Sequence, residues 1–353
     1  MKTYRVLVHE KTLGKVKDYL GELKAGKRPG NYLRKRLPDG DVSQVVTEEF
    51  LELLVRTKLP QIFAESAVVG DGSDWNQQEL SLLGDVNIAV PVTVYDNARH
   101  TNPQVHRRPF PATLLFTPGA LLRNGRGHTP ADWNEATRNE EIDAGAYYQL
   151  YERRLLPLFL FADKAMRNED KTAFITVPGL GCGQFAGKFR GRLGAELKAT
   201  LMTFLENHGD RFSNIKAVYY DPYSECDNER CSIAGVDFFV RPLAQGNEGQ
   251  SQLCQPRDYE EAGDDFSHCE LFSVVAWDHV SWPGNDFYAG SRATDDGVKA
   301  AATNTMAVLT EVEGHYNAEV NQYQPPTEYR NWGEVIVNNS IAIEVKNNLL
   351  VFS

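Results

Sequence analysis

The first sixty residues carry apolar side chains at the spacing of amphipathic helices. Segments 15–23 and 43–58 show the pattern best, and Pro60 follows the second. Four apolar residues of the second segment fall on one helical face: Val46, Phe50, Leu53 and Leu54. The pattern predicts an N-terminal helical accessory region, residues 1–85.

From residue 86 the apolar pattern changes to short, β-branched runs bounded by Pro and Gly, which are typical of strands. Five such runs stand out: 86–96, 112–121, 173–177, 215–223 and 269–278. Helical patterns fall between and after them, at 144–168, 193–209 and 294–311. Alternating strands and helices predict an α/β sheet with helices on both faces. We therefore assign residues 86–353 to a second domain.

Composition and charge narrow the class of protein. Of the 353 residues, 42% are apolar and 24% charged, which is typical of a folded soluble chain. The formal charge of −11 argues against nucleic acid as a partner, and no apolar run reaches the roughly 18 residues of a membrane helix. The N-terminus has no signal-peptide pattern, so we expect a cytoplasmic location, with the five cysteines as free thiols.

A glycine-rich turn, "PGLGCGQFAGKFRG" at 178–191, follows one predicted strand and precedes a helix. Bare amides and a helix N-terminus together bind anions, usually phosphate. The spacing G-x-G-x-G matches neither the dinucleotide fingerprint nor the nucleoside-triphosphate loop. A turn that is merely tight would have the same composition, and the residues alone support both interpretations equally. The candidate ligand-binding residues are Gly179, Gly181, Cys182, Gly183, Gln184 and Phe185.

An acidic loop, "VAWDHVSWPGNDFYAGSRATDD" at 275–296, follows the last predicted strand. Asp295 and Asp296 can simply complement the dipole of the next helix, and Asp286 can be a turn residue. Asp278 has no such explanation. Ligands of open α/β sheets bind at the carboxyl ends of strands, so the alternative is an acid-rich loop that grips a ligand.

The order of these segments resembles that of the macrodomains. "ATLLFTPGALL" resembles a macrodomain strand motif, and the glycine-rich turn is similar to the family's phosphate loop. The stretch 273–306 resembles the other ADP-ribose loop, which ordinary macrodomains place before the phosphate loop rather than after it. The resemblance implies a macrodomain-like mixed sheet between helices, rearranged or permuted, with an N-terminal helical lobe.

Within this superfamily, residues 110–315 are similar to the MavL-type effector ADP-ribosylhydrolases, which are related to the poly(ADP-ribose) glycohydrolases. The resemblance rests on the spacing of Asp278, Asp286 and Asp296. It implies removal of ADP-ribose from mono-ADP-ribosylated arginine on a protein, with ubiquitin as the target and the host cytosol as the location of a secreted effector. The glycohydrolase "GGG…QEE" signature is absent, which argues against cleavage of poly(ADP-ribose) chains.

The resemblance also implies roles for individual residues. Asp278, Asp286 and Asp296 become the catalytic residues, and Asn285 and Asp295 join the glycine-rich turn in binding ADP-ribose, with no metal or other cofactor. Two alternatives remain. A pure ADP-ribose reader would need the phosphate loops but not the acids. A Mg²⁺-dependent hydrolase would use Asp286, Asp295 and Asp296 as oxygen ligands.

Overall fold

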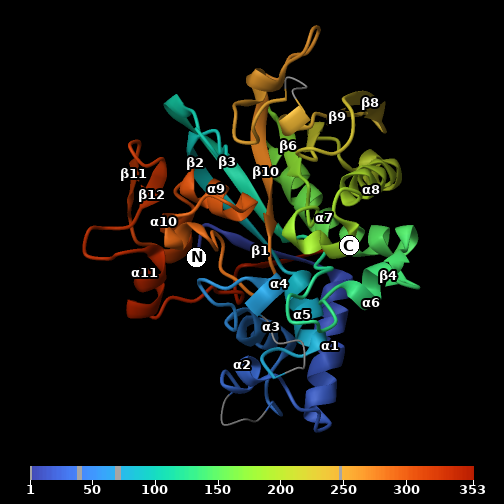
Figure 1. Ribbon diagram of the computed structural model, residues 1–353, viewed down its shortest axis with the longest axis vertical. Helices are drawn as coiled ribbons and strands as arrows, with labels where there is room; N and C mark the ends of the chain where they lie inside the picture. The colour runs from blue at the N-terminus through green and yellow to red at the C-terminus, as the bar shows by residue number, and fades with distance from the viewer. Residues whose placement is uncertain (1, 38–41, 68–72, 246–248) are drawn as a thin grey trace.

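The computed structural model describes residues 2–37, 42–67, 73–245 and 249–353, and its centre is a nine-stranded sheet (Figure 1). The strand order across the sheet is β13-β1-β2-β3-β10-β6-β7-β9-β8. The strands are β1 (Arg5–His9), β2 (Asn87–Asp96), β3 (Val105–Pro118), β6 (Thr172–Pro178), β7 (Ile215–Asp221), β8 (Glu229–Ile233), β9 (Val236–Val240), β10 (Cys269–Trp277) and β13 (Leu349–Phe352).

The sheet is mixed, with a parallel block at its middle. From β3 through β10, β6 and β7 to β9, each strand is parallel to the next, and β13 is parallel to β1. The pairs β1/β2, β2/β3 and β8/β9 are antiparallel. Strand β10 is late in the chain, yet it lies between β3 and β6. The carboxyl ends of β3, β10, β6 and β7 therefore meet at one edge of the sheet, where the candidate loops follow them.

Two hydrophobic clusters cover the two faces of the sheet. The helices α7 (Ala144–Met166) and α8 (Leu193–His208) pack in one cluster, which takes Val274 of β10. The other cluster takes the next residue, Val275. This alternation follows from the two-residue period of a strand. The helices of the second cluster are α1 (Glu10–Lys24), α3 (Thr47–Val55), α5 (Gln77–Gly84), α9 (Asp295–Ala301), α10 (Thr305–Thr310) and α11 (Trp332–Asn338).

The remaining elements are short. They are the helices α2 (Asn31–Arg34), α4 (Ala64–Ala67) and α6 (Trp133–Ala136), the strands β4 (Thr137–Arg138), β5 (Glu141–Ile142), β11 (His315–Asn317) and β12 (Gln322–Gln324), and several 3₁₀ turns. No helix among the described residues is both long and apolar enough to span a bilayer.

The predicted mixed sheet between helices is confirmed, and all five predicted strands are present as β2, β3, β6, β7 and β10. The predicted helix 294–311 is interrupted and forms α9 and α10. Between them Thr303 bridges to Val94 of β2.

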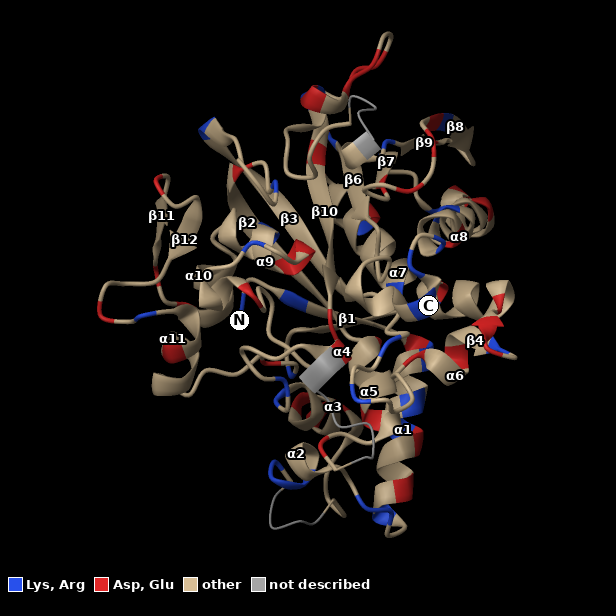
Figure 2. Ribbon diagram, in the orientation of Figure 1, with Lys and Arg blue, Asp and Glu red and all other residues tan. Residues whose placement is uncertain are grey.

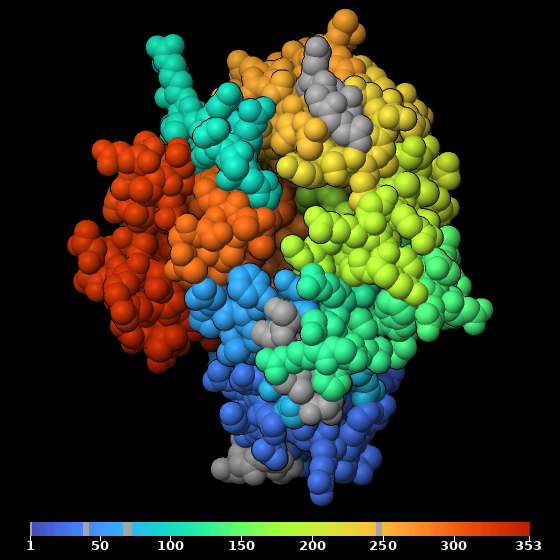
Figure 3. Space-filling model, viewed as in Figure 1, coloured from blue at the N-terminus to red at the C-terminus, as the bar shows by residue number. Residues whose placement is uncertain are grey.

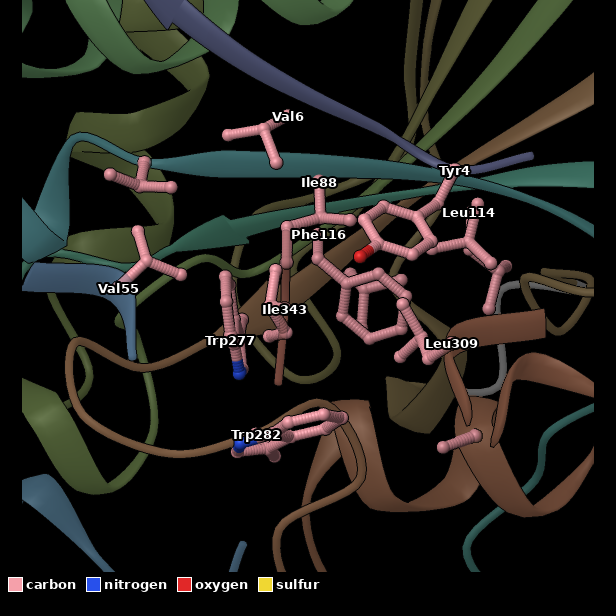
Figure 4. Packing of buried hydrophobic residues seen from close by; sticks show 14 of the residues in the cluster. Tyr4, Val6, Val55, Ile88, Leu114, Phe116, Trp277, Trp282, Leu309 and Ile343 are labelled. Carbon is pink, nitrogen blue, oxygen red and sulfur yellow. The ribbon is translucent and has the colours of Figure 1, made fainter. Parts of the chain in front are cut away.

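Within the N-terminal region that was predicted to be helical, Arg5–His9 instead form β1 and pair with both β2 and β13. Val6, Leu7 and Val8 are fully buried, because this short strand is covered on both faces and therefore lacks an alternating pattern. Tyr4 and Val6 lie in the same cluster as Val55 and Trp277 (Figure 4). The division into regions 1–85 and 86–353 stays an interpretation of the sequence.

Candidate functional site

A cavity of about 840 Å³ opens where the strands of the parallel block end. Figure 3 shows the hollow between the orange residues around α9 and the yellow-green residues that follow the glycine-rich turn. Its wall combines the ends of β6, β7 and β10 with the loops that follow them, a segment before β3 and a segment of the N-terminal region. These segments are far apart in the chain, and the topology of the sheet brings them together.

The glycine-rich turn forms one wall. Gly181 has φ +73°, and a Cβ at this position would lie 2.8 Å from the carbonyl oxygen of Ala120, so this residue must be glycine for the two loops to touch. A Cβ on Gly183, in contrast, would meet no atom within 4 Å, and this residue lines the cavity. At Gly183 the backbone of the turn thus borders open cavity space without a side chain, as close approach of an anion requires.

Asp278 comes directly after β10 and lines the cavity. It is 5% exposed, and its Oδ1 accepts hydrogen bonds from the amides of Val280 (2.7 Å) and Ser281 (2.6 Å). Its Oδ2 lies 3.4 Å from Nδ2 of Asn285, another residue of the cavity wall. The carboxylate is therefore held in one orientation by its own loop.

Asp296 lies in the first turn of α9 and also lines the cavity. Figure 2 shows this acidic helix start in red near the centre of the molecule. Oδ2 of Asp296 accepts hydrogen bonds from the amides of Gly284 (3.2 Å) and Asn285 (3.1 Å). Burial, together with the negative charges of Asp278 and Asp286, raises the pKa of Asp296 to about 8, although its hydrogen bonds act in the opposite direction. This carboxyl group is mostly protonated at neutral pH.

Asp286 is buried close by but is not part of the cavity wall. One of its oxygens accepts hydrogen bonds from the amides of Ala293 (2.7 Å) and Thr294 (3.1 Å), and the other accepts from the Thr294 hydroxyl (2.5 Å). A Cβ on Gly297 would lie 1.6 Å from Oδ1 of Asp286, so the glycine makes room for this carboxylate. Asp286 braces the 291–294 loop, which itself lines the cavity.

Asp295 lines the cavity and is tied to a lysine that the sequence analysis did not single out. Its Oδ2 accepts from the amide of Ala276 (2.8 Å) and lies 3.1 Å from Nζ of Lys299. Lys299 is 1% exposed and also donates to the carbonyl oxygen of Val274 (2.6 Å) and to Oε1 of Gln252 (2.8 Å). Burial lowers the pKa of Lys299, and Asp295 opposes that shift. The i, i+4 spacing of Asp295 and Lys299 in the sequence could have predicted this ion pair on one face of the helix.

The N-terminal region also contributes to the site, which the sequence analysis missed. Lys58 is 3% exposed, and its Nζ donates to the carbonyl oxygens of Asp278 (3.2 Å) and His279 (2.6 Å). Nζ also lies 3.9 Å from the centre of the Trp277 ring. Burial lowers the pKa of Lys58 to about 7, although the charge of Asp278 opposes this. No local sequence pattern links residues this far apart in the chain.

Almost all the predicted site residues thus share one cavity. Its wall contains Gly179, Gly181, Cys182, Gly183, Gln184, Phe185, Asp278, Asn285, Asp295 and Asp296. Asp286 supports the wall from behind. In the part of the chain that the structure describes, no three His, Cys, Asp or Glu side chains are grouped so that they could hold a metal ion.

Comparison with known protein families shows to which family the chain belongs. The family model described as "Macrodomain effector MavL" matches residues 4–329, which include β1, the N-terminal helices and the whole cavity. The chain belongs to the MavL macrodomain effector family. No curated protein matches it. Membership of the MavL family gives the chain an ADP-ribose-related function, and the match extends the resemblance beyond residues 110–315 into the N-terminal region.

Proposed function

We propose that this protein is a hydrolase that removes ADP-ribose from mono-ADP-ribosylated arginine on a protein by cleaving the N-glycosidic bond. The observation that carries the proposal is the arrangement of the cavity, in which the bare glycine-rich turn and the carboxyl groups of Asp278 and Asp296 line one space. A diphosphate suits the amides of the turn, and the reacting ribose then lies toward the carboxyl groups.

The chemistry needs both a proton donor and a positioned water. When the bond to the anomeric carbon breaks, the cationic guanidinium of the substrate departs as a neutral guanidine, which is a poor leaving group unless it gains a proton as it leaves. Asp296 carries such a proton at neutral pH, because burial and neighbouring charges raise its pKa to about 8. In the proposed step, a water oxygen bonds to the anomeric carbon while the bond from that carbon to the guanidine nitrogen breaks. Asp296 gives its proton to the departing nitrogen, and Asp278 takes the proton of the water.

Asp286 has a different role in this proposal from the catalytic one that the sequence analysis expected. Its two carboxylate oxygens are used by Ala293 and Thr294. We assign it as a positioning residue that holds the 291–294 loop against the ligand and adds negative charge near Asp296.

The preference for arginine follows from charge. A guanidinium is cationic at every working pH, and a cavity with several carboxyl groups attracts it. The resemblance to MavL-type effectors proposes ubiquitin as the modified protein and the host cytosol as the location. The charge of −11 favours a basic protein surface at long range, an effect that salt weakens.

The test compares ADP-ribose release from arginine-linked and glutamate-linked substrates, measured by mass, with ubiquitin as one carrier and an unrelated protein as the other. We expect faster release from arginine, with the preference reduced by salt. Equal or faster release from the ester contradicts the arginine assignment. Binding of ADP-ribose without any release supports the reader alternative, and loss of release in chelator supports the Mg²⁺-dependent one.

A further inference from the structure

Residues 58–65 of the N-terminal region run beside the loop that carries Asp278 and are hydrogen-bonded to it. The amide of Leu59 donates to the carbonyl oxygen of Val280 (2.8 Å), and the amide of Trp282 donates back to the carbonyl oxygen of Leu59 (2.8 Å). Further along, the amide of Ile62 donates to Oδ1 of Asn285 (3.0 Å). These bonds fix where the rest of the segment runs.

Because of these bonds, Phe63 and Glu65 reach the cavity wall, and Glu65 is close enough to Asp278 to feel its charge. The carbonyl oxygen of Glu65 accepts from the amide of Gly125 (2.6 Å), so the segment also contacts the loop beside the glycine-rich turn. Glu65 is partly exposed, whereas Asp278 and Asp296 are buried. Glu65 is therefore the more solvent-accessible of these three carboxyl groups in the cavity wall.

The surroundings of the Glu65 carboxyl group favour a further cation beside it. Burial raises its pKa, and the negative charge of Asp278 raises it further, while Arg123 acts in the opposite direction. A cation held between Glu65 and Asp278 would reduce both the cost of burial and the mutual repulsion. The guanidinium of a modified arginine is a cation that carries several donors in a planar fork.

We infer that Glu65 binds the guanidinium of the ADP-ribosylated arginine and so selects this linkage. The inference rests on the proposed function, because it names the part of the substrate that Glu65 recognises. Glu65 is a specificity residue in this scheme. The guanidinium is cationic in the bound substrate as well as in the transition state, so losing the contact weakens binding more than it slows the chemical step.

The test measures binding rather than turnover, with calorimetry on Asp296→Asn protein, in which release is suppressed. This protein should bind ADP-ribosylarginine more tightly than ADP-ribose. Adding Glu65→Gln should cut the affinity for ADP-ribosylarginine by at least about tenfold, the scale of one hydrogen bond to a charged group. The affinity for ADP-ribose should stay the same. Glu49→Gln, an exposed change on α3, is the matched control and should leave both affinities unchanged.

Each result decides the inference separately from the proposed function. An unchanged preference for ADP-ribosylarginine in Glu65→Gln overturns the inference, whatever the wild-type protein hydrolyses. Loss of ADP-ribose binding as well means that Glu65 only supports the cavity wall, which also overturns it. If Glu65→Gln removes the preference but wild-type protein releases no ADP-ribose, the proposed function fails and the inferred contact stands.

Discussion

Replacing Asp296 with asparagine should stabilise the protein, by an amount that grows with pH. Burial raises the pKa of this carboxyl group from 3.8 to about 8, and each unit corresponds to about 1.4 kcal/mol. Full ionisation of Asp296 therefore costs the folded state on the order of 5 kcal/mol, a large part of the total stability of a typical domain.

The sign follows from proton binding. Between about pH 4 and pH 8 the folded protein keeps a proton on Asp296 that the unfolded chain has lost, so stability falls as the pH rises through this window. Asparagine has nearly the same shape, and its Oδ1 can still accept from Gly284 and Asn285 without ever ionising. The variant should match wild type near pH 4 and exceed it by several kcal/mol at pH 8.5.

Urea unfolding at pH 4.5 and pH 8.5 measures this difference, because all other groups titrate alike in both proteins and cancel. Glu48→Gln, which removes an exposed acid from the first turn of α3, is the matched control and should change stability by at most about 0.5 kcal/mol at either pH. A stabilisation that is equal at both pH values, or a loss of stability at pH 8.5, refutes the reasoning. The same variant should lose at least about a hundredfold in ADP-ribose release if Asp296 is the proton donor.

Three further predictions test other parts of the site. Gly183→Val should fold but lose the rise in melting temperature that ADP-ribose gives, because its side chain points into open cavity space; Gly14→Val on α1, also without neighbours, is the control. Asp286→Asn should lower turnover at least about tenfold by loosening the 291–294 loop, with wild-type turnover contradicting a positioning role. Since the pKa of Lys58 is lowered to about 7, wild type should gain stability over Lys58→Met between pH 7 and pH 10, and urea unfolding at both values checks this.

The sequence predicted what depends on local pattern. Continuous apolar runs identified β6 and β10, since such strands are buried on both faces. The glycine-rich turn and the acidic loop could be placed in one site because both follow parallel strands, and the carboxyl ends of such strands share one edge of the sheet.

The contributions that the sequence did not reveal depend on pairings between distant segments. Strand β1 pairs with β13, at the other end of the chain. Lys58 contacts Asp278 only because the fold brings these two distant residues together. Burial likewise decides the chemistry of Asp296, which by sequence alone is an ordinary acid at a helix start. Propensity and periodicity describe neighbours along the chain, whereas these effects come from neighbours in space.

Two buried lysines, Lys58 and Lys299, hold the part of the cavity wall that carries the acidic residues. Lys299 is bonded to Asp295 and to the backbone of β10, and Lys58 is bonded to the backbone of the Asp278 loop. Both lysines are buried and hold the wall, and the pKa of Asp296 stays raised because burial and the charges of Asp278 and Asp286 outweigh the interactions that favour its ionised form. A cationic substrate in the cavity can offset these negative charges. The free-energy cost of ionising Asp296 in the folded state is thereby linked to the proposed preference for arginine. Deleting residues 58–65 would remove Lys58 and Glu65 together. We therefore expect selectivity in ligand binding to depend on this segment as much as on the aspartates.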